Sequence, residues 1–369
     1  MILLIGYDVS RRGGIERLTL QVKTALEDQG HDVLLLCPRK LGPGGLGRWL
    51  GRGRFLLALA LSLPRASTVL SMHALLLAPL RWLAPLMALA GLVGGPVRRQ
   101  RRFCWLHGLE VWGDALAPVS ADLKRCDGLL ASSRFSRDRV REQPGPWPPV
   151  AVVHPMADLI DAHQPPLPLP SAPILLTVGR MVREERYKGH RLVLAALEIL
   201  RQRQHLPANL RWQVIGDGDD RAALEQETHA RGLAPWVHFL GGVDDQELEH
   251  QLRHCSLLVL PSAYAARPGS RAEGEGFGIV YLEAAQAGRA SIGCRQGGQS
   301  DLIVDGTTGW LIDPDPEALA NGLEAALADP ASLSRSGERA RQRALACFGK
   351  DRFTKSLVAA LQLKAPAEN

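Results

Sequence analysis

The stretch Glu275-Gly-Phe-Gly-Ile-Val-Tyr-Leu-Glu283, continued by Ala284-Ala-Gln-Ala-Gly288, combines a glycine turn, an apolar helical run and two carboxylates eight positions apart. A helix that begins near Gly278 leaves the N–H groups of its first turn, such as those of Ile279 and Val280, without acceptors inside the helix. The partial positive charge at that end favours a phosphate. The carboxylates can accept hydrogen bonds from the hydroxyls of a sugar and of a ribose. The stretch therefore predicts a binding site for a nucleotide sugar.

Two glutamates at this spacing also arise by chance, and the alternative is a solvated helix cap with one surface carboxylate. The whole phrase EGFGIVYLEAAQAG resembles the nucleotide-sugar signature of retaining GT-B glycosyltransferases, in particular glycosyltransferase family 4. This resemblance implies that Glu275 contacts the donor sugar and that Glu283 contacts the ribose. Glu273 competes for the first role, but only Glu275 abuts the Gly-Phe-Gly turn.

Basic residues follow the β-rich run Ile174–Val178, first in Gly179-Arg180 and then in Glu184-Glu-Arg-Tyr-Lys188-Gly189. Two such charges in a loop are usually solvated, but at a strand end a guanidinium and an ammonium can neutralise a diphosphate together. The Gly-Arg and Lys-Gly pairs resemble the diphosphate-binding pair of the family, which implies that role for Arg180 and Lys188. The Glu-Arg-Tyr-Lys-Gly form is similar to that of its bacterial exopolysaccharide mannosyltransferases. The spacer is longer than the commonest family pattern, which leaves Arg183 and Arg186 as substitutes.

The first forty residues read as a strand, a glycine loop, a helix and a second strand, which is a βαβ unit and predicts a parallel sheet. Gly13 and Gly14 open the helix and allow the backbone to approach a phosphate closely. The loop is not G-x-G-x-x-G and no acidic residue follows at the required distance, so a dinucleotide fingerprint is poorly supported. The Gly-Gly loop also matches the family, and we expect Gly13 and Gly14 to contact the nucleotide sugar.

The predicted strand Arg102–Leu106 delivers His107-Gly-Leu-Glu-Val-Trp112 to its C-terminal end, where open α/β sheets place ligand-binding groups. A lone histidine is more often a satisfied core residue. The His-Gly-x-Glu-x-Trp phrase, however, resembles the acceptor-side histidine loop of the family, which implies that His107 positions the donor sugar and the acceptor hydroxyl. His73 ends the preceding strand without such a phrase, and we predict a structural role for it.

Further apolar runs between turn residues predict the remaining strands of two domains. These strands are Ile2–Ile5, Val33–Cys37, Thr68–Met72, Asp127–Ala131, Val150–Val153, Trp212–Ile215, Val237–Phe239, Leu257–Pro261 and Ser291–Cys294. We predict an acceptor-binding domain over residues 1–155, a proline-rich linker over 156–173 and a nucleotide-sugar-binding domain over 174–349. The terminal segment 350–369 is expected to pack back on the first domain. The fold class is α/β, and the resemblance implies GT-B: two Rossmann-like domains whose parallel sheets face an interdomain cleft.

Composition and charge narrow the class of protein. Apolar residues make up 46% and charged residues 22% of the 369, which is typical of a globular protein. The six cysteines are scattered without metal-ligand spacing, so we expect reduced thiols, no structural zinc and no bound metal. The run 75–93 is strongly apolar but contains Pro79, Arg81 and Pro85, which favours a buried or surface-docked helix over a membrane span.

The first domain is the basic one, because residues 1–155 hold 21 Lys and Arg against 11 Asp and Glu. No nucleic-acid-binding motif accompanies this charge, so we expect no nucleic-acid partner. An anionic membrane surface or a lipid-phosphate acceptor explains it, and an ordinary arginine-rich surface is the alternative. The chain opens directly on a strand rather than on a signal peptide, which favours the cytoplasm or the inner face of the membrane.

The family resemblance implies a retaining glycosyltransferase that needs no cofactor or metal and moves a hexosyl group, with GDP-mannose favoured as the donor. The expected acceptor is a glycan or a polyprenyl-diphosphate-linked glycan of cell-surface polysaccharide synthesis. His107, Glu275, Arg180 and Lys188 would serve the reaction, while the glycine loop, the start of the 278–280 helix and Glu283 would hold the nucleotide. The alternatives are a UDP-sugar-dependent enzyme of the same fold and a non-catalytic GT-B scaffold.

Overall fold

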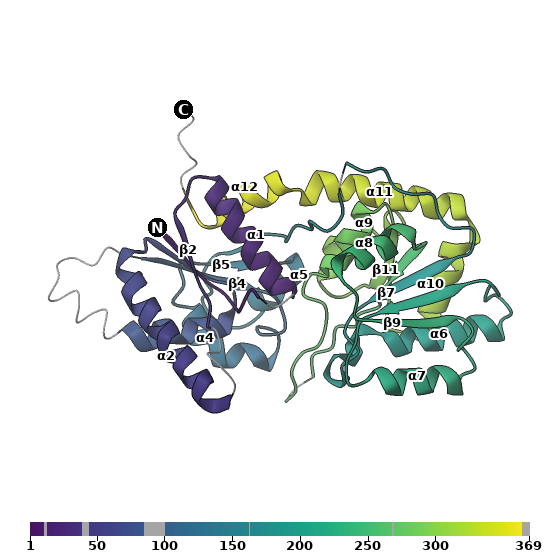
Figure 1. Cartoon of the computed structure of the whole chain (residues 1–369), viewed down its shortest axis with the longest axis horizontal. Helices are drawn as coiled ribbons and strands as arrows, with labels where there is room; N and C mark the ends of the chain where they lie inside the picture. The colour runs from purple at the N-terminus through teal and green to yellow at the C-terminus, as the bar shows by residue number, and fades with distance from the viewer. Residues whose placement is uncertain (11–12, 39–43, 85–99, 162, 268, 364–369) are drawn as a thin grey trace. The chain divides into compact units, whose positions relative to one another are not determined.

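The computed structural model describes the chain apart from residues 11–12, 39–43, 85–99, 162, 268 and 364–369 (Figure 1). The chain divides into two compact units. The first comprises Met1–Met156, Arg267–Arg271 and Lys350–Asn369, and the second comprises Ala157–Ala266 and Ala272–Gly349. The segment 156–173, expected as a linker, therefore clusters with the second unit from Ala157 onward, and Ile160 is buried in that unit's core.

The described strands of the first unit form one six-stranded parallel sheet in the order β2-β1-β3-β4-β5-β6. The strands are β1 Ile2–Ile5, β2 Val33–Leu36, β3 Thr68–Ser71, β4 Arg101–Leu106, β5 Gly128–Ala131 and β6 Val150–Val152. The helices are α1 Gly14–Asp28, α2 Gly44–Ser62, α4 Ala117–Leu123, α5 Arg134–Arg141 and α12 Lys350–Ala360. Parallel strands need crossover connections, and the helices of those crossovers cover the faces of the sheet. All residues of β1 and β3 are accordingly buried.

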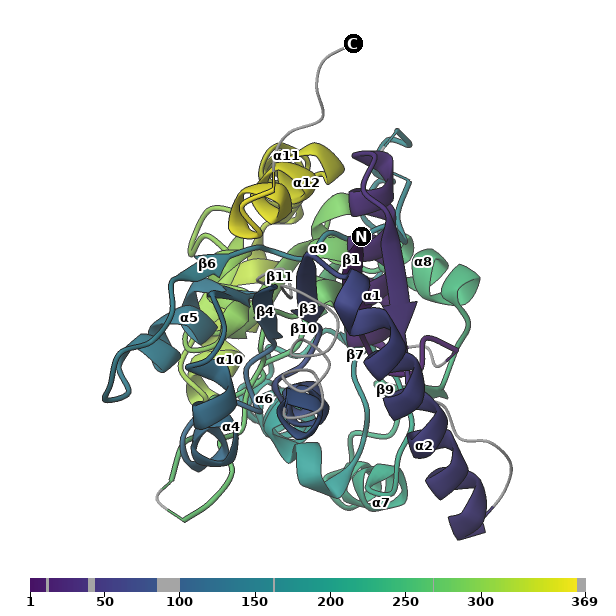
Figure 2. The same cartoon turned by 90° about the vertical axis from the view of Figure 1, so that its left-hand side faces the viewer.

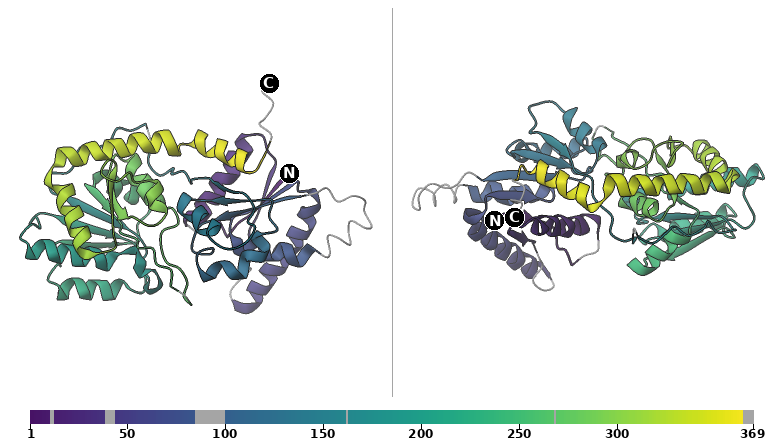
Figure 3. Two further views of the ribbon diagram at one scale, coloured as in Figure 1. Left: turned by 180° about the vertical axis from the view of Figure 1, so that it is seen from behind. Right: turned by 90° about the horizontal axis from the view of Figure 1, so that it is seen from above.

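The chain's terminal helix completes the core of the first unit. Phe353 and Leu357 of α12 are buried against Leu18 and Val22 of α1 and against Trp105 of β4. Figure 3 shows α12, in yellow, beside the purple α1. The apolar face of the amphipathic helix α12 thus helps to bury the core of the first unit.

The described strands of the second unit form a second six-stranded parallel sheet in the order β12-β11-β10-β7-β8-β9. The strands are β7 Ile174–Val178, β8 Arg211–Ile215, β9 Val237–Gly241, β10 Leu257–Val259, β11 Ala290–Cys294 and β12 Gly309–Ile312. The helices are α6 His190–Gln202, α7 Arg221–Ala230, α8 Asp245–His254, α9 Ile279–Gln286, α10 Pro316–Ala328 and α11 Pro330–Phe348.

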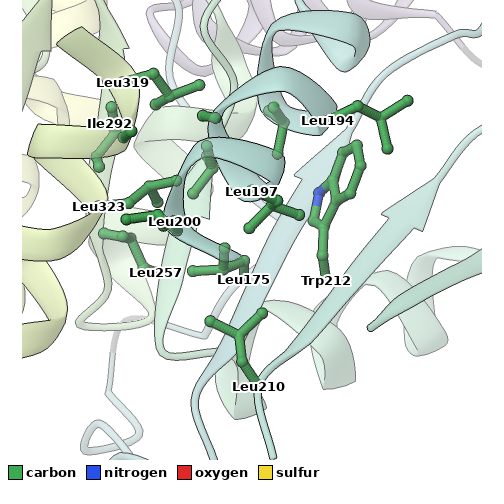
Figure 4. Packing of buried hydrophobic residues seen from close by; sticks show 14 of the residues in the cluster. Leu175, Leu194, Leu197, Leu200, Leu210, Trp212, Leu257, Ile292, Leu319 and Leu323 are labelled. Carbon is green, nitrogen blue, oxygen red and sulfur yellow. The ribbon is translucent and has the colours of Figure 1, made fainter. Parts of the chain in front are cut away.

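Both faces of the second sheet are covered. Leu175 and Leu257 point into a core shared with α6, α7 and α10. Leu197 lies between Leu323 and Trp212 in this core (Figure 4). The next residues along the same strands, including Leu176, point into a second core formed with α8, α9 and α11. Alternate residues of a strand face opposite sides of a sheet, so near-continuous apolar strands are required here. The predicted α/β class with two Rossmann-like domains is confirmed.

Candidate functional site

The strand order of the second sheet reverses between β7 and β10, since β8 and β9 extend one side and β11 and β12 the other. Ligands of open α/β sheets bind beyond the carboxyl ends of the strands at such a switch point. Arg180 follows β7 there and Ser262 follows β10. The switch point therefore gathers part of the predicted site.

A largely buried ion pair joins two of the predicted residues at this point. The Lys188 Nζ atom lies 2.7 Å from Glu275 Oε2, and the two side chains are only 16% and 14% exposed. Burial lowers the pKa of Lys188, but the Glu275 carboxylate outweighs it and the net pKa is raised. Ser262 Oγ donates to the same carboxylate oxygen at 3.4 Å. The ammonium is thus held charged beside a carboxylate, with little water to screen it.

Arg180 lies nearby in a different environment. Its side chain is 73% exposed and its guanidinium pairs with Glu185 of the short 3₁₀ helix Arg183–Lys188. Of the two substitutes, Arg186 is committed elsewhere, because it donates to both oxygens of Asp220 at 2.7 and 3.0 Å. These bonds hold the pKa of Asp220 at about 2. Arg180 is therefore more available than Arg186, and its planar fork suits a phosphate. Arg183 is 67% exposed and stays a candidate substitute.

The start of α9 confirms the predicted helix boundary at Gly278. Gly278 is the N-cap residue with φ +84°, a conformation that favours glycine, and a Cβ there would lie 2.5 Å from the Tyr281 ring. Tyr281 donates its hydroxyl to the Leu260 carbonyl at the end of β10, which ties α9 to the switch point. Ile279 and Val280 then present first-turn N–H groups, as an anion site requires.

Glu283 lies on α9, one helical turn after Ile279, and is 2% exposed. The carboxylate for which we predict a ribose contact is thus buried within the second unit. The structure thus gathers Arg180, Lys188, Glu275 and the start of α9 around one end of the second sheet.

In the first unit, His107 directly follows β4 and is fixed by two hydrogen bonds. Its backbone N–H donates to Glu110 Oε1 at 2.6 Å, and its Nε2 atom bonds the Met72 carbonyl at 2.7 Å. Burial lowers the pKa of His107 to about 4, although the Met72 carbonyl opposes the change. The imidazole is therefore neutral at pH 7.

Gly13 and Gly14 also lie in the first unit, as the N-cap residue and first residue of α1. A Cβ at Gly13 would lie 2.3 Å from a Glu16 carboxylate oxygen, so the Glu16 side chain turns back over the helix start. The Glu16 carboxylate also opposes, as a smaller cause, the lowering of the His107 pKa.

Sequence reasoning missed three polar residues that support the second-unit site: Ser262, Tyr281 and Gln299. The buried Gln299 Nε2 donates to the carbonyls of Cys294 and Gln296 at 2.7 and 2.9 Å. Its loop touches the Gly-Phe-Gly turn, because a Cβ at Gly298 would lie 2.2 Å from the Gly276 carbonyl oxygen. The Gly297-Gly298-Gln299 pattern after a strand was the available signal.

Across the described residues, no three His, Cys, Asp or Glu side chains gather closely enough to hold a metal ion. In the same part of the chain, no helix combines the length and hydropathy needed to cross a bilayer.

The second unit thus presents a paired lysine and glutamate beside the start of a helix, at the switch point of a doubly wound α/β sheet. Residues 161–343 match the family described as "Glycosyl transferases group 1".

Curated relatives agree with the family. Glycogen synthase of Mycobacterium tuberculosis is 30% identical over 70% of this chain, which spans about half (56%) of that protein's length. A GDP-mannose-dependent alpha-(1-6)-phosphatidylinositol monomannoside mannosyltransferase of Mycolicibacterium smegmatis is 28% identical over 73% of this chain and 70% of its own length.

Solved structures match the fold over nearly the whole chain. Anabaena HepE, solved in complex with UDP and glucose, superposes with a TM-score of 0.72 at 18% identity, covering 98% of this chain and 99% of that one. Sucrose-phosphate synthase from Thermosynechococcus elongatus superposes with a TM-score of 0.75 at 19% identity, covering 98% of both chains. The structural neighbours are GT-B glycosyltransferases, so the GT-B fold is confirmed.

Proposed function

We propose that this protein is a metal-independent, retaining glycosyltransferase that moves a hexosyl group from a nucleotide sugar to a glycan or a polyprenyl-diphosphate-linked acceptor. The observation that supports this proposal most strongly is the largely buried pair of Lys188 and Glu275 beside the start of α9. A diphosphate offers Lys188 a stronger partner, and a sugar hydroxyl offers Glu275 a donated hydrogen bond. Ligand binding would thus replace the ion pair between Lys188 and Glu275 with a contact from Lys188 to the diphosphate and a contact from Glu275 to the sugar.

Each residue of the site has a part in this proposal. Arg180, Lys188 and the N–H groups at residues 278–280 stabilise the charge of the departing diphosphate. Glu275 orients the sugar, Glu283 holds the ribose and His107 positions hydroxyls of donor and acceptor. The departing phosphate would accept the proton of the attacking hydroxyl in a same-face substitution, so no protein nucleophile is required.

GDP-mannose is the favoured donor. The Glu-Arg-Tyr-Lys-Gly phrase supports it, and a relative similar over 73% of this chain is described as GDP-mannose-dependent. UDP-sugars are the alternative, because the structural neighbour HepE was solved with UDP and glucose.

A lipid-linked acceptor fits the surface of α2. Trp49 is 75% exposed on this helix, and Leu57 and Leu61 are each 62% exposed. Arg52 and Arg54 lie on the same helix and are exposed as well. Apolar side chains beside arginines suit the interface of an anionic membrane, where the rings and chains enter and the guanidinium groups meet phosphates. We propose peripheral contact of the basic first unit with such a surface.

Calorimetry with GDP, UDP, ADP and their sugar conjugates, with and without a chelator, tests the proposal. We expect selective binding that the chelator does not change. Lys188→Met should weaken nucleotide binding about tenfold to a hundredfold, because it removes one charge-assisted hydrogen bond. The control Lys23→Met removes a lysine paired with a glutamate at 2.6 Å on the exposed face of α1 and should not change affinity. UDP-selective binding would replace the mannosyl donor, and absence of all nucleotide binding would favour a non-catalytic scaffold.

A further inference from the structure

The first sheet has its own switch point, between β1 and β3, and aromatic side chains collect there. Tyr7 follows β1, His73 follows β3 and His107 follows the neighbouring β4, three strands that Figure 2 shows together. The rings of Tyr7 and His73 meet edge to face with centroids 5.2 Å apart. The rings of His73 and His107 are stacked with centroids 6.0 Å apart and an interplanar angle of 23°. The switch-point rule places a ligand at this edge.

The hydrogen bonds of His73 determine its tautomer. Its Nδ1 atom accepts the Leu75 N–H at 3.2 Å and caps the 3₁₀ helix Ala74–Leu77. Burial lowers the pKa of His73, so the ring is neutral at pH 7 and its single proton is on Nε2. Among the described residues, no group accepts a hydrogen bond from this Nε2–H. His73 therefore offers one open donor.

His107 has the complementary arrangement. Its Nε2 atom contacts a carbonyl oxygen, that of Met72, which can only accept. The proton of this neutral ring is therefore on Nε2, and Nδ1 carries a lone pair. Within the described part of the chain, no group donates to that Nδ1 atom. His107 therefore offers one open acceptor beside the open donor of His73.

A hydroxyl is the group that meets an open donor and an open acceptor at once, because it accepts and donates. We propose that His73 and His107 hold one sugar hydroxyl between them: His73 Nε2–H donates to the hydroxyl oxygen, and the hydroxyl donates to His107 Nδ1. Two bonds of about 2.8 Å bridge nitrogens up to about 5.6 Å apart. The centroids of the two rings are 6.0 Å apart, so the proposal requires the open Nε2 and Nδ1 atoms to lie on the sides of the rings that face one another. The inference rests on the proposed glycosyltransferase function and adds His73 as a substrate-binding residue.

A metal between the two imidazoles is the competing occupant. No third His, Cys, Asp or Glu ligand joins them in the described residues, and the Nε2 lone pair of each ring is replaced by a proton. The tautomers therefore favour a hydroxyl over a cation. The hydroxyl can belong to the acceptor glycan or to the transferred hexose.

The variant His73→Asn separates capping from sugar binding. Asparagine is a strong N-cap residue, so its side-chain oxygen retains the bond from the Leu75 N–H, but it has no atom at the position of Nε2. His73→Gln is the converse, because its amide reaches the Nε2 position and loses the cap. We expect the melting temperature to stay unchanged for His73→Asn and to fall for His73→Gln.

The measurement is ¹⁵N NMR of histidine-labelled full-length protein at pH 7.5, with resonances assigned by the single variants. We expect both His73 and His107 as Nε2–H tautomers, and both rings should shift together on titration. The probes are methyl α-D-mannopyranoside, methyl α-D-glucopyranoside, GDP-mannose and UDP-glucose, with GDP and UDP as sugar-free controls. A response to a methyl glycoside assigns the hydroxyl to an acceptor sugar, and a response to a nucleotide sugar alone assigns it to the transferred hexose.

His73→Asn should raise the dissociation constant of the responding sugar about tenfold, as loss of one hydrogen bond predicts, while His73→Gln should raise it less. An Nδ1–H tautomer of His73, silence of both rings with every probe, or an unchanged constant in His73→Asn would overturn the inference. Calorimetry on the same samples separates the two proposals: nucleotide binding with silent rings refutes the hydroxyl site alone, and absence of nucleotide binding refutes the glycosyltransferase.

Discussion

The pair of Lys188 and Glu275 makes a quantitative prediction about stability, because the chain contains a second pair of the same chemistry in a different environment. The Lys23–Glu27 pair has almost the same distance, 2.6 Å against 2.7 Å. Its side chains are 33% and 41% exposed, whereas those of Lys188 and Glu275 are 16% and 14% exposed. Burial is therefore the variable that differs between them.

Removing one partner of a buried pair leaves an uncompensated charge and costs about 3–5 kcal/mol. The residual exposure of Lys188 admits some water, so we expect Glu275→Gln to cost about 2–3 kcal/mol of unfolding free energy. Removing both charges with Lys188→Met and Glu275→Gln should cost much less than the sum of the single changes. The corresponding cycle at Lys23 and Glu27 should give about 0.3–0.5 kcal/mol.

The assay is urea unfolding of the full chain, followed by tryptophan fluorescence and by far-ultraviolet circular dichroism, for the four variants of each cycle. Agreement of the two probes establishes that one free energy describes the transition. A coupling energy at Lys188 and Glu275 within about 0.5 kcal/mol of the exposed pair would refute the reasoning, because burial would then have no effect on the pair.

Three further predictions concern pH, backbone strain and membrane contact. Burial is the main cause that lowers the pKa of His190 to about 4, and the charges of Lys188 and Arg191 add to it. As the pH falls, the His190 imidazole therefore takes up a proton near pH 6.5 in the unfolded chain but only near pH 4 in the folded chain. Stability should therefore fall by about 3 kcal/mol between pH 6.5 and 4, and urea midpoints should show a flatter pH profile for His190→Leu. Gly278→Ala should destabilise the protein by about 1–3 kcal/mol, because φ is +84° and the Tyr281 ring occupies the space of the new methyl group. The control Gly53→Ala, in the interior of α2 where no described residue lies near the new methyl group, should be neutral or stabilising. Calorimetric unfolding of both variants measures the difference. Binding of the protein to anionic vesicles should weaken as salt rises and should weaken further in Trp49→Ala, and salt-insensitive sedimentation would instead indicate hydrophobic insertion.

Local patterns predicted most of the strands, and the structure extends or shortens them by one or two residues. Ile2–Ile5 and Ile174–Val178 have the predicted bounds. The helix Pro330–Phe348 was not predicted, because its sequence is polar and contains Gly337 in its interior. A Cβ at Gly337 would lie 2.1 Å from the Gly288 carbonyl oxygen. That glycine marks a close tertiary approach, and a contact between segments distant in sequence leaves no periodic signal.

The predicted site shows the same limit. Motif spacing identified Lys188 and Glu275 separately, but only the fold shows that they pair, since 87 residues separate them. Ser262 was missed because a serine after a strand has many roles, and its contact with Glu275 depends on β10 lying beside β7.

His73 illustrates why a residue without a motif can still matter. A lone histidine after a strand is uninformative in sequence, and its structural role as a cap is real. The parallel pairing of β3 with β4 brings the His73 ring beside that of His107. Within the residues that the structure describes, His73 accepts a hydrogen bond at Nδ1 and keeps a free donor at Nε2, whereas His107 donates at Nε2 and keeps a free acceptor at Nδ1. Because each ring has only one proton, satisfying one nitrogen fixes what the other can do. The proposed preference of this edge for a hydroxyl group therefore rests on backbone groups of the chain itself, the Leu75 amide and the Met72 carbonyl.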